Sequence, residues 1–137
     1  PDTLITELRQ VMEDYAGIKR NKQDLQTGLE QVRNIRDRYQ SDLSVSEGPT
    51  SVQFEQANNL RVMLRVAEAT LKSAKERTES RGAHYRTDYP DKDKTQRNNI
   101  IYQKDNPELQ RRSVPDISGE IQAVVDEGHE LDYHHLE

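Results

Sequence analysis

The chain has 137 residues, the length of one domain, but only 31% of them are apolar, whereas a globular domain usually has about 45–50%. Cysteine is absent, which excludes disulfides and thiolate chemistry, and no apolar run approaches the roughly 20 residues of a membrane span. The net charge is −5, and residues 116–137 contain seven carboxylates and no lysine or arginine. The charges of residues 1–115 therefore sum to +2. A body so nearly balanced lacks the basic face of a nucleic-acid-binding protein.

Apolar residues recur at steps of three and four in the first forty residues, which predicts two amphipathic helices. The first covers about residues 3–16, and Gly17 is expected in the left-handed position that closes a helix. The second covers about residues 22–40 and begins after Asn21, a good N-cap, with Asp24 in its first turn. Because the connection is so short, the two helices are expected to be antiparallel neighbours.

A third and longer helix is predicted after a loop rich in serine, glycine and proline. Thr50 is expected as its N-cap, in a capping box with Gln53. Apolar residues then repeat at three and four positions from Phe54 to Thr78, which predicts a helix of about 45 Å. We interpret Gly28 on the second helix as a point of close approach between helices, the alternative being a tolerated surface glycine.

The fold class predicted for the chain is mainly α, with three parts. Residues 1–90 are expected to form an up-down-up three-helix bundle with a long third helix. Residues 91–115 are expected to be a loop and a β-hairpin packed on the bundle, since turn residues separate two short strand-like runs. Residues 116–137 are expected to be an acidic tail with a weak helix before Gly128.

The segment from Arg77 to Pro90 concentrates charge at the end of the third helix, with Gly82 to bend the backbone. A histidine flanked by arginines and a carboxylate suits an acid–base or anion site. It suits equally a salt-bridge network that anchors the helix end against a neighbouring domain, and we favour this structural or interdomain interpretation. The candidate residues are Arg77, Glu79, Arg81, His84, Arg86 and Asp88.

Three further groups are weaker candidates. They are a basic group at the first interhelix turn (Lys19, Arg20 and Lys22), arginines on the second helix (Arg33, Arg36 and Arg38) and histidines in the tail (His129, His134 and His135). The basic group is interpreted as a solvated loop, with an anion or a partner's acidic patch as the alternative. The helix arginines are expected to face solvent. The spacing of the histidines fits no named metal-ligand pattern, so adventitious metal binding or none is expected.

The run from Glu79 to Arg86, Glu-Ser-Arg-Gly-Ala-His-Tyr-Arg, resembles the signature that closes the helical C-terminal domain of succinate dehydrogenase and fumarate reductase flavoproteins. The resemblance covers roughly residues 4–115. The family usually continues with an Asn-Trp pair, whereas this chain has Asn98-Asn99 and no tryptophan. Aspartate oxidase and adenylylsulfate reductase flavoproteins have related helical domains, so the branch stays open.

The resemblance implies a parent flavoprotein that uses FAD to oxidise succinate or reduce fumarate, in the cytoplasm and peripheral on the inner face of the membrane through the parent complex. Its implied partners are the flavin-binding and capping domains of the parent chain and an iron–sulfur subunit. This chain has no Gly-rich FAD fingerprint and no position that matches the family's substrate-binding residues, so no catalytic, cofactor-binding or metal residue is assigned to it. Its expected role is to brace the flavin and capping domains through residues 81–88.

A different class of function also fits the residues, namely a stand-alone helical module that binds a partner protein through an exposed stripe. The chain begins almost directly in a helix, which is typical of a domain excised from a longer polypeptide, and Leu136-Glu137 is compatible with a vector-derived end. A continuous upstream reading frame with a Gly-rich βαβ unit would favour the flavoprotein domain.

Overall fold

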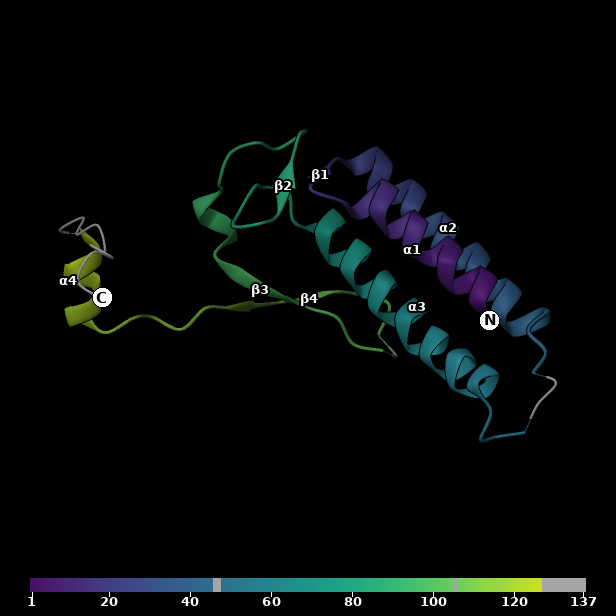
Figure 1. Ribbon diagram of the computed structural model, residues 1–137. Helices are drawn as coiled ribbons and strands as arrows, with labels where there is room; N and C mark the ends of the chain where they lie inside the picture. The colour runs from purple at the N-terminus through teal and green to yellow at the C-terminus, as the bar shows by residue number, and fades with distance from the viewer. Residues whose placement is uncertain (46–47, 105, 127–137) are drawn as a thin grey trace, which may run out of the picture.

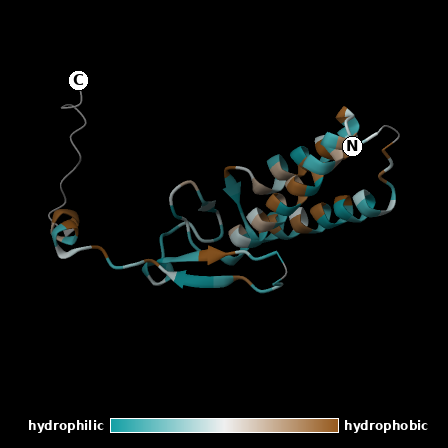
Figure 2. Cartoon of the chain, turned by 90° about the horizontal axis from the view of Figure 1, so that it is seen from below, coloured by the Kyte–Doolittle hydropathy of each residue, from teal (hydrophilic) through white to brown (hydrophobic). Residues whose placement is uncertain are grey.

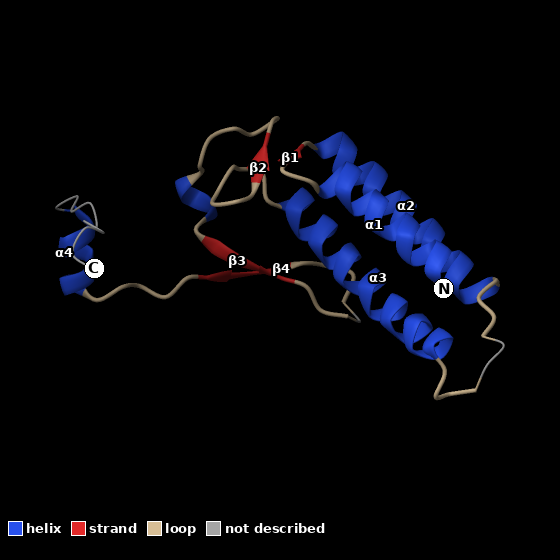
Figure 3. Cartoon of the chain, in the orientation of Figure 1, coloured by secondary structure: helices blue, strands red, loops and turns tan. Residues whose placement is uncertain are grey.

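The computed structural model describes residues 1–45, 48–104 and 106–126. The molecule is mainly helical, with a small two-stranded antiparallel sheet (Figures 1 and 3). The long helices are α1 (Asp2–Ala16), α2 (Lys22–Ser41) and α3 (Val52–Glu76). The other elements are the strands β1 (Lys19–Arg20), β2 (Tyr85–Arg86), β3 (Asn98–Ile101) and β4 (Gln110–Ser113), the 3₁₀ helix η1 (Lys94–Gln96) and helix α4 (Gly119–Asp126).

The three long helices lie along one another and enclose one apolar core (Figure 1). In Figure 2 hydrophobic and hydrophilic residues alternate along each helix, as the predicted stripes require. The stripes supply the core residues Leu4, Leu8, Val11, Leu25, Leu29, Val32, Ile35, Leu60, Leu64 and Leu71. A chain poor in apolar residues therefore builds a core by placing seven of its eleven leucines on the inner faces of three helices.

Gly28 lies where α2 packs tightly against α1 and α3, which confirms the predicted close approach. A Cβ added at Gly28 would lie 2.9 Å from Tyr15 Cβ and 3.0 Å from Leu71 Cδ2. Both distances are shorter than an ordinary carbon–carbon contact. The missing side chain therefore lets α2 pack against both α1 and α3.

Two predicted helix ends were wrong in detail. Gly17 has φ −63° and ψ −156°, so it is extended rather than left-handed. A glycine is nevertheless needed there, because a Cβ would lie 2.8 Å from the carbonyl oxygen of Glu13. The N-cap of α3 is Ser51 rather than Thr50, since the Ser51 hydroxyl accepts a hydrogen bond of 3.2 Å from the backbone N–H of Phe54.

The connection between α1 and α2 contains a strand that the sequence did not predict. β1 and β2 pair in parallel, with Lys19 opposite Tyr85 and Arg20 opposite Arg86. The N–H of Thr87 also donates to the carbonyl of Arg20 at 2.8 Å. Two charged segments that are far apart in sequence therefore lie side by side at one end of the helices.

The predicted hairpin is present as β3 and β4, which pair antiparallel with Ile101 opposite Gln110. Two contacts attach it to α3. Arg111 pairs with Glu76 at 2.9 Å, and the Lys72 ammonium lies 5.6 Å from the ring centre of Tyr102.

The chain leaves the hairpin in an extended segment that leads to α4, which lies apart from the three long helices (Figure 1). Ile121, Val124 and Val125 are exposed on α4. The tail histidines His129, His134 and His135 lie outside the described residues. Within the described ranges, no helix has both the length and the apolar character that a bilayer crossing demands.

Candidate functional site

The predicted charged segment lies at the end of the three long helices where α1 ends, α2 begins and α3 ends (Figure 1). A helix end leaves backbone groups without intrahelical partners, donors at the N-terminus and acceptors at the C-terminus. Side chains of residues 77–88 form hydrogen bonds with these backbone groups at α2 and α3. At α1 the hydrogen bonds come from Arg20, which itself contacts His84.

Arg86 caps the C-terminus of α3. Its side chain is only 1% exposed, and Nη1 donates to the carbonyls of Ala74, Lys75 and Arg77 at 3.0, 3.2 and 3.0 Å. These carbonyls belong to the last turn of the helix and to the residue that follows it. A buried guanidinium therefore satisfies acceptors at the negative end of the helix dipole.

Asp88 joins this cap to the start of α2. Arg86 donates from Nε to Oδ1 at 2.8 Å and from Nη2 to Oδ2 at 2.7 Å, a bidentate pair. Oδ2 also accepts from the backbone N–H of Lys22, the first residue of α2, at 3.0 Å. The hydrogen bonds from Arg86 are the largest cause that lowers the pKa of Asp88, to about 2.

Glu79 is fully buried and is surrounded by donors. Arg81 donates to both carboxylate oxygens, at 2.8 and 3.0 Å, and Arg77 donates at 2.7 Å. The backbone N–H of Asp93 adds a fourth bond of 2.8 Å. The Arg81 hydrogen bond is the main cause that holds the pKa of Glu79 at about 2, despite the opposing effect of burial.

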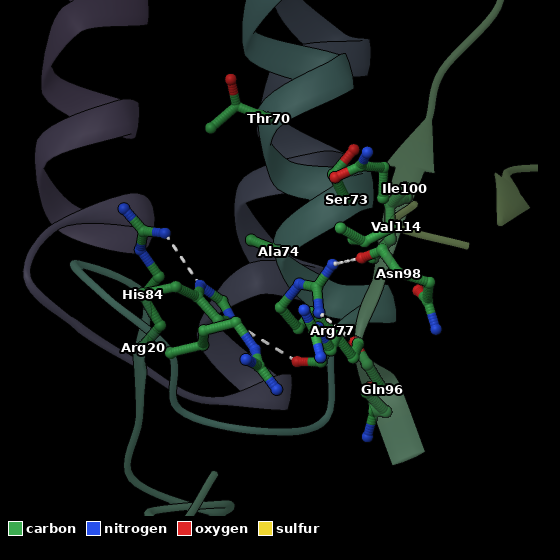
Figure 4. Close-up of a pocket in the computed structure, with 13 residues that line it drawn as sticks. Arg20, Thr70, Ser73, Ala74, Arg77, His84, Gln96, Asn98, Ile100 and Val114 are labelled. Carbon is green, nitrogen blue, oxygen red and sulfur yellow. Dashed lines mark hydrogen bonds between the residues drawn. The ribbon is translucent and has the colours of Figure 1, made fainter. Parts of the chain in front are cut away.

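Arg20 is the residue of this site that sequence reasoning missed. Its Nε donates to the carbonyls of Ala16 and Gly17 at 3.1 and 2.8 Å, so it caps the C-terminus of α1. Its Nη1 lies 3.0 Å from His84 Nδ1 (Figure 4). The interpretation of Arg20 as part of a solvated loop is therefore wrong. Its position four residues after the last residue of a helix is the signal that could have identified it.

His84 connects the α1 cap to the α3 cap. Because a guanidinium can only donate, Nδ1 of His84 accepts from Arg20, and Nε2 carries the hydrogen and donates to the carbonyl of Arg77 at 3.3 Å. Burial is the main cause that lowers the pKa of His84 below its usual value, and the nearby charges of Arg20, Arg86 and Arg77 lower it further. The imidazole is therefore neutral near pH 7.

Five of the six predicted residues form two ion-paired groups, one around Glu79 and one around Asp88, and the sixth, His84, takes part through hydrogen bonds. The groups meet at the carbonyl of Arg77, which accepts from both His84 and Arg86. Gly82, with φ 58°, makes the tight turn that aligns them, and it is closed by hydrogen bonds between Arg81 and His84. We call Arg20, Arg77, Glu79, Arg81, His84, Arg86 and Asp88 the helix-end cluster.

The arginines of α2 do not all face solvent as predicted. Arg38 donates to both carboxylate oxygens of Glu7 on α1, at 2.7 and 2.9 Å. Arg36 pairs with Glu68, a nearly buried carboxylate on α3. Arg33 alone of the three is exposed. Two of the three arginines therefore form ion pairs between helices.

A pocket of 630 Å³ opens beside the helix-end cluster (Figure 4). Its lining includes five basic side chains and no carboxylate: Arg20, Arg77, Arg81, His84 and Arg97. Arg77 also reaches toward β3, where it donates to the carbonyl of Asn98 at 2.7 Å. Such a lining can bind carboxylate or phosphate oxygens. The described residues contain no group of three side chains suited to a metal ion.

Comparison with known proteins identifies the family. Residues 5–123 match the family described as fumarate reductase flavoprotein C-term. The succinate dehydrogenase flavoprotein subunit of Coxiella burnetii is 35% identical over 97 residues, which are 68% of this chain and 16% of that protein. The L-aspartate oxidase of Pseudomonas aeruginosa is 40% identical over 88 residues, 62% of this chain and 15% of that protein.

A solved structure agrees in fold. Mycobacterium smegmatis Sdh1 in complex with UQ1 superposes with a TM-score of 0.79 and 28% identity, over 93% of this chain and 23% of that one. The chain thus spans less than a quarter of each of these three proteins. The resemblance carried by residues 79–86 is confirmed, and the chain belongs to the C-terminal domain family of the FAD-dependent succinate dehydrogenase and fumarate reductase flavoproteins.

Proposed function

We propose that this chain is the helical C-terminal domain of a flavoprotein subunit that oxidises succinate or reduces fumarate. Its role there is to brace the flavin-binding and capping domains through residues 81–88. FAD, bound elsewhere in the parent, supplies the redox chemistry, and this domain acts on it only through the placement of those domains. The stand-alone binding module is not favoured, because the family match covers residues 5–123.

The observation that carries the proposal is the helix-end cluster. The cluster ties the ends of three helices, because Arg20 donates to a carbonyl at the end of α1, Arg86 donates to a carbonyl of α3 and Asp88 accepts from the first N–H of α2. An up-down-up bundle closed in this way has one stiff, basic end. A stiff surface docks at a lower entropic cost than a flexible one. The iron–sulfur subunit and the inner face of the membrane belong to the same proposal, through the parent complex.

The bracing role is tested with Arg81→Ala in the full-length flavoprotein. The variant is expected to lose flavin and to melt at a lower temperature, and the same substitution in the 137-residue chain measures how much of that loss is local. Arg33→Ala, on the exposed face of α2, is the control. If Arg81→Ala keeps its flavin and its melting temperature, the bracing role is wrong.

The proposal that FAD binds outside this domain has its own test. The 137-residue chain is expected to bind no FAD, as measured by equilibrium dialysis, and saturable binding would contradict this. The substrate is assigned by assaying the full-length flavoprotein with succinate, fumarate and L-aspartate. Turnover of L-aspartate in place of the other two would move the parent to the aspartate oxidase branch.

A further inference from the structure

Helix α3 carries one stripe of side chains that changes from apolar to polar along its length. Val62, Val66, Thr70 and Ser73 follow one another at steps of four and three, so they lie on the same side of α3, and Arg77 is the residue that directly follows the helix. The apolar end of the stripe borders a groove between α1 and α3, the polar end borders the arginine-lined pocket, and Thr70 lines both. The two hollows are therefore one continuous surface, which we call the α1/α3 face.

The apolar half of this face combines a groove with exposed valines. Its groove has a volume of 370 Å³ and is lined mainly by Leu8, Met12, Val62, Met63, Val66 and Ala67. Val62 and Val66 are 51% and 59% exposed. On α2, by contrast, every exposed residue is polar. Exposed valines beside a groove, on a molecule with few apolar residues, indicate a surface that is covered in the assembled protein.

The basic half carries positive charge that the cluster does not neutralise. Glu79 is the one carboxylate that pairs with both Arg77 and Arg81. The Arg20 guanidinium contacts backbone carbonyls and a neutral imidazole. Arg97 is exposed and has no hydrogen bond or ion pair within the described part of the chain. The pocket therefore has guanidinium groups available to an incoming carboxylate.

We propose that the α1/α3 face docks a segment of the parent polypeptide that places apolar side chains on Val62 and Val66 and a carboxylate in the arginine-lined pocket. The inference rests on the proposed function, because it requires the parent. Two observations select this occupant. The pocket is complementary to negative charge, and the chain spans only 15–23% of its relatives, so most of such a polypeptide lies outside these residues.

Cysteine labelling tests which face is covered. The chain has no cysteine, so Val66→Cys places a single labelling site on the apolar half. Val52→Cys is the control, because Val52 is 67% exposed on the same helix and lines neither hollow. Both cysteines are expected to react with iodoacetamide at similar rates in the 137-residue chain.

In the full-length flavoprotein, with labelled positions located by peptide mapping, Val66→Cys is expected to react about tenfold or more slowly than in the isolated chain. Val52→Cys is expected to keep its rate or to change less. If Val66→Cys reacts at the same rate in both proteins, this face is open and the inference is wrong.

Charge reversal tests the basic half. Arg97→Glu is expected not to lower the melting temperature of the 137-residue chain, because Arg97 has no partner to lose within the described residues. In the full-length protein it is expected to lower the melting temperature and flavin content, whereas Arg33→Glu on α2 is expected to change neither. Equal behaviour of the two variants overturns the carboxylate contact.

The two proposals fail separately. If Arg81→Ala releases flavin while Val66→Cys stays reactive, the domain braces the parent through another face. If Val66→Cys is protected while Arg81→Ala keeps its flavin, the face docks as inferred but the bracing role is wrong.

Discussion

At the scale of single residues, Arg86 makes many of the hydrogen bonds that hold the helix-end cluster together. It is a buried cation whose five nitrogen-borne hydrogens face three carbonyls and one carboxylate. A buried charge is tolerated only when it is paired and hydrogen-bonded, and removal of one partner leaves the others buried without donors.

Arg86→Met is therefore expected to destabilise the chain by about 3–5 kcal/mol, the usual cost of breaking a buried ion pair. Methionine keeps most of the side-chain volume, so the loss reports hydrogen bonds rather than a cavity. Urea unfolding followed by circular dichroism measures it. Arg33→Met, on the exposed face of α2, is expected to change stability by less than about 0.5 kcal/mol, and an equal loss in both variants would contradict the capping role.

The shifted carboxylates predict a direction for the pH dependence. The pKa of Glu79 falls from 4.5 in the unfolded chain to about 2 in the folded one, and that of Asp88 falls from 3.8 to about 2. Stability from these groups is therefore complete above their unfolded values and is lost as the pH drops toward 2. His84, whose folded pKa lies below 6.5, stabilises the fold above pH 6.5 and loses that contribution as the pH falls below it.

Glu79→Gln is expected to be less stable than the wild-type chain at neutral pH and to show a weaker loss of stability between pH 4.5 and 2. Glu55→Gln, on an exposed position in the first turn of α3, is the matched control and should keep most of the slope. Thermal melting across this pH range provides the measurement. An unchanged slope in Glu79→Gln would mean that its carboxylate does not titrate as described.

At the scale of elements, the sequence predicted what is periodic and local. The stripes of α1, α2 and α3 follow from the spacing of leucine and valine, and Asn21 caps α2 as expected, accepting from the N–H of Asp24 at 2.9 Å. The pairing of β1 with β2 was missed because each has two residues, too few for any pattern. The cap at Ser51 was misplaced by one residue because Thr50 and Ser51 both have a hydroxyl.

The contact between helices at Gly28 is tested by Gly28→Ala. Alanine favours a helix by about 1 kcal/mol over glycine, but here its methyl group would lie 2.9 Å from Tyr15 Cβ. Overpacking of this kind costs about 1–3 kcal/mol. We expect net destabilisation in urea unfolding, whereas Gly119→Ala, which has open space around the added carbon, should be neutral or slightly stabilising. A stabilised Gly28→Ala would show that the helices can move apart at no cost.

At the scale of the whole molecule, the periodicity of apolar residues correctly indicated a chain that is mainly helical. The members of the candidate site could be named from one continuous segment, since six of them lie between Arg77 and Asp88. Arg20 could have been identified only as a cap of α1, because its contact with His84, 64 residues away at 3.0 Å, forms only in the folded chain. Long-range contacts of this kind leave no local pattern.

Deletion of residues 116–137 tests whether the tail is independent of the body. Because α4 lies apart from the long helices and exposes its apolar residues, the urea midpoint is expected to change little. The net charge should shift from −5 to +2, since the deletion removes seven carboxylates and no basic residue. A large fall in the midpoint would show that the tail contributes to the core.

The pairing of β1 with β2 also bears on the order of folding. The α1–α2 contacts close over a short connection, whereas the hydrogen bonds of Thr87 and Asp88 to residues 20 and 22 each bridge 66 or 67 positions. Closing such a long loop costs more entropy than closing a short turn. The helical hairpin should therefore form before the transition state and these long-range bonds after it. Substitutions that weaken the bonds should mainly accelerate unfolding and leave the folding rate almost unaltered.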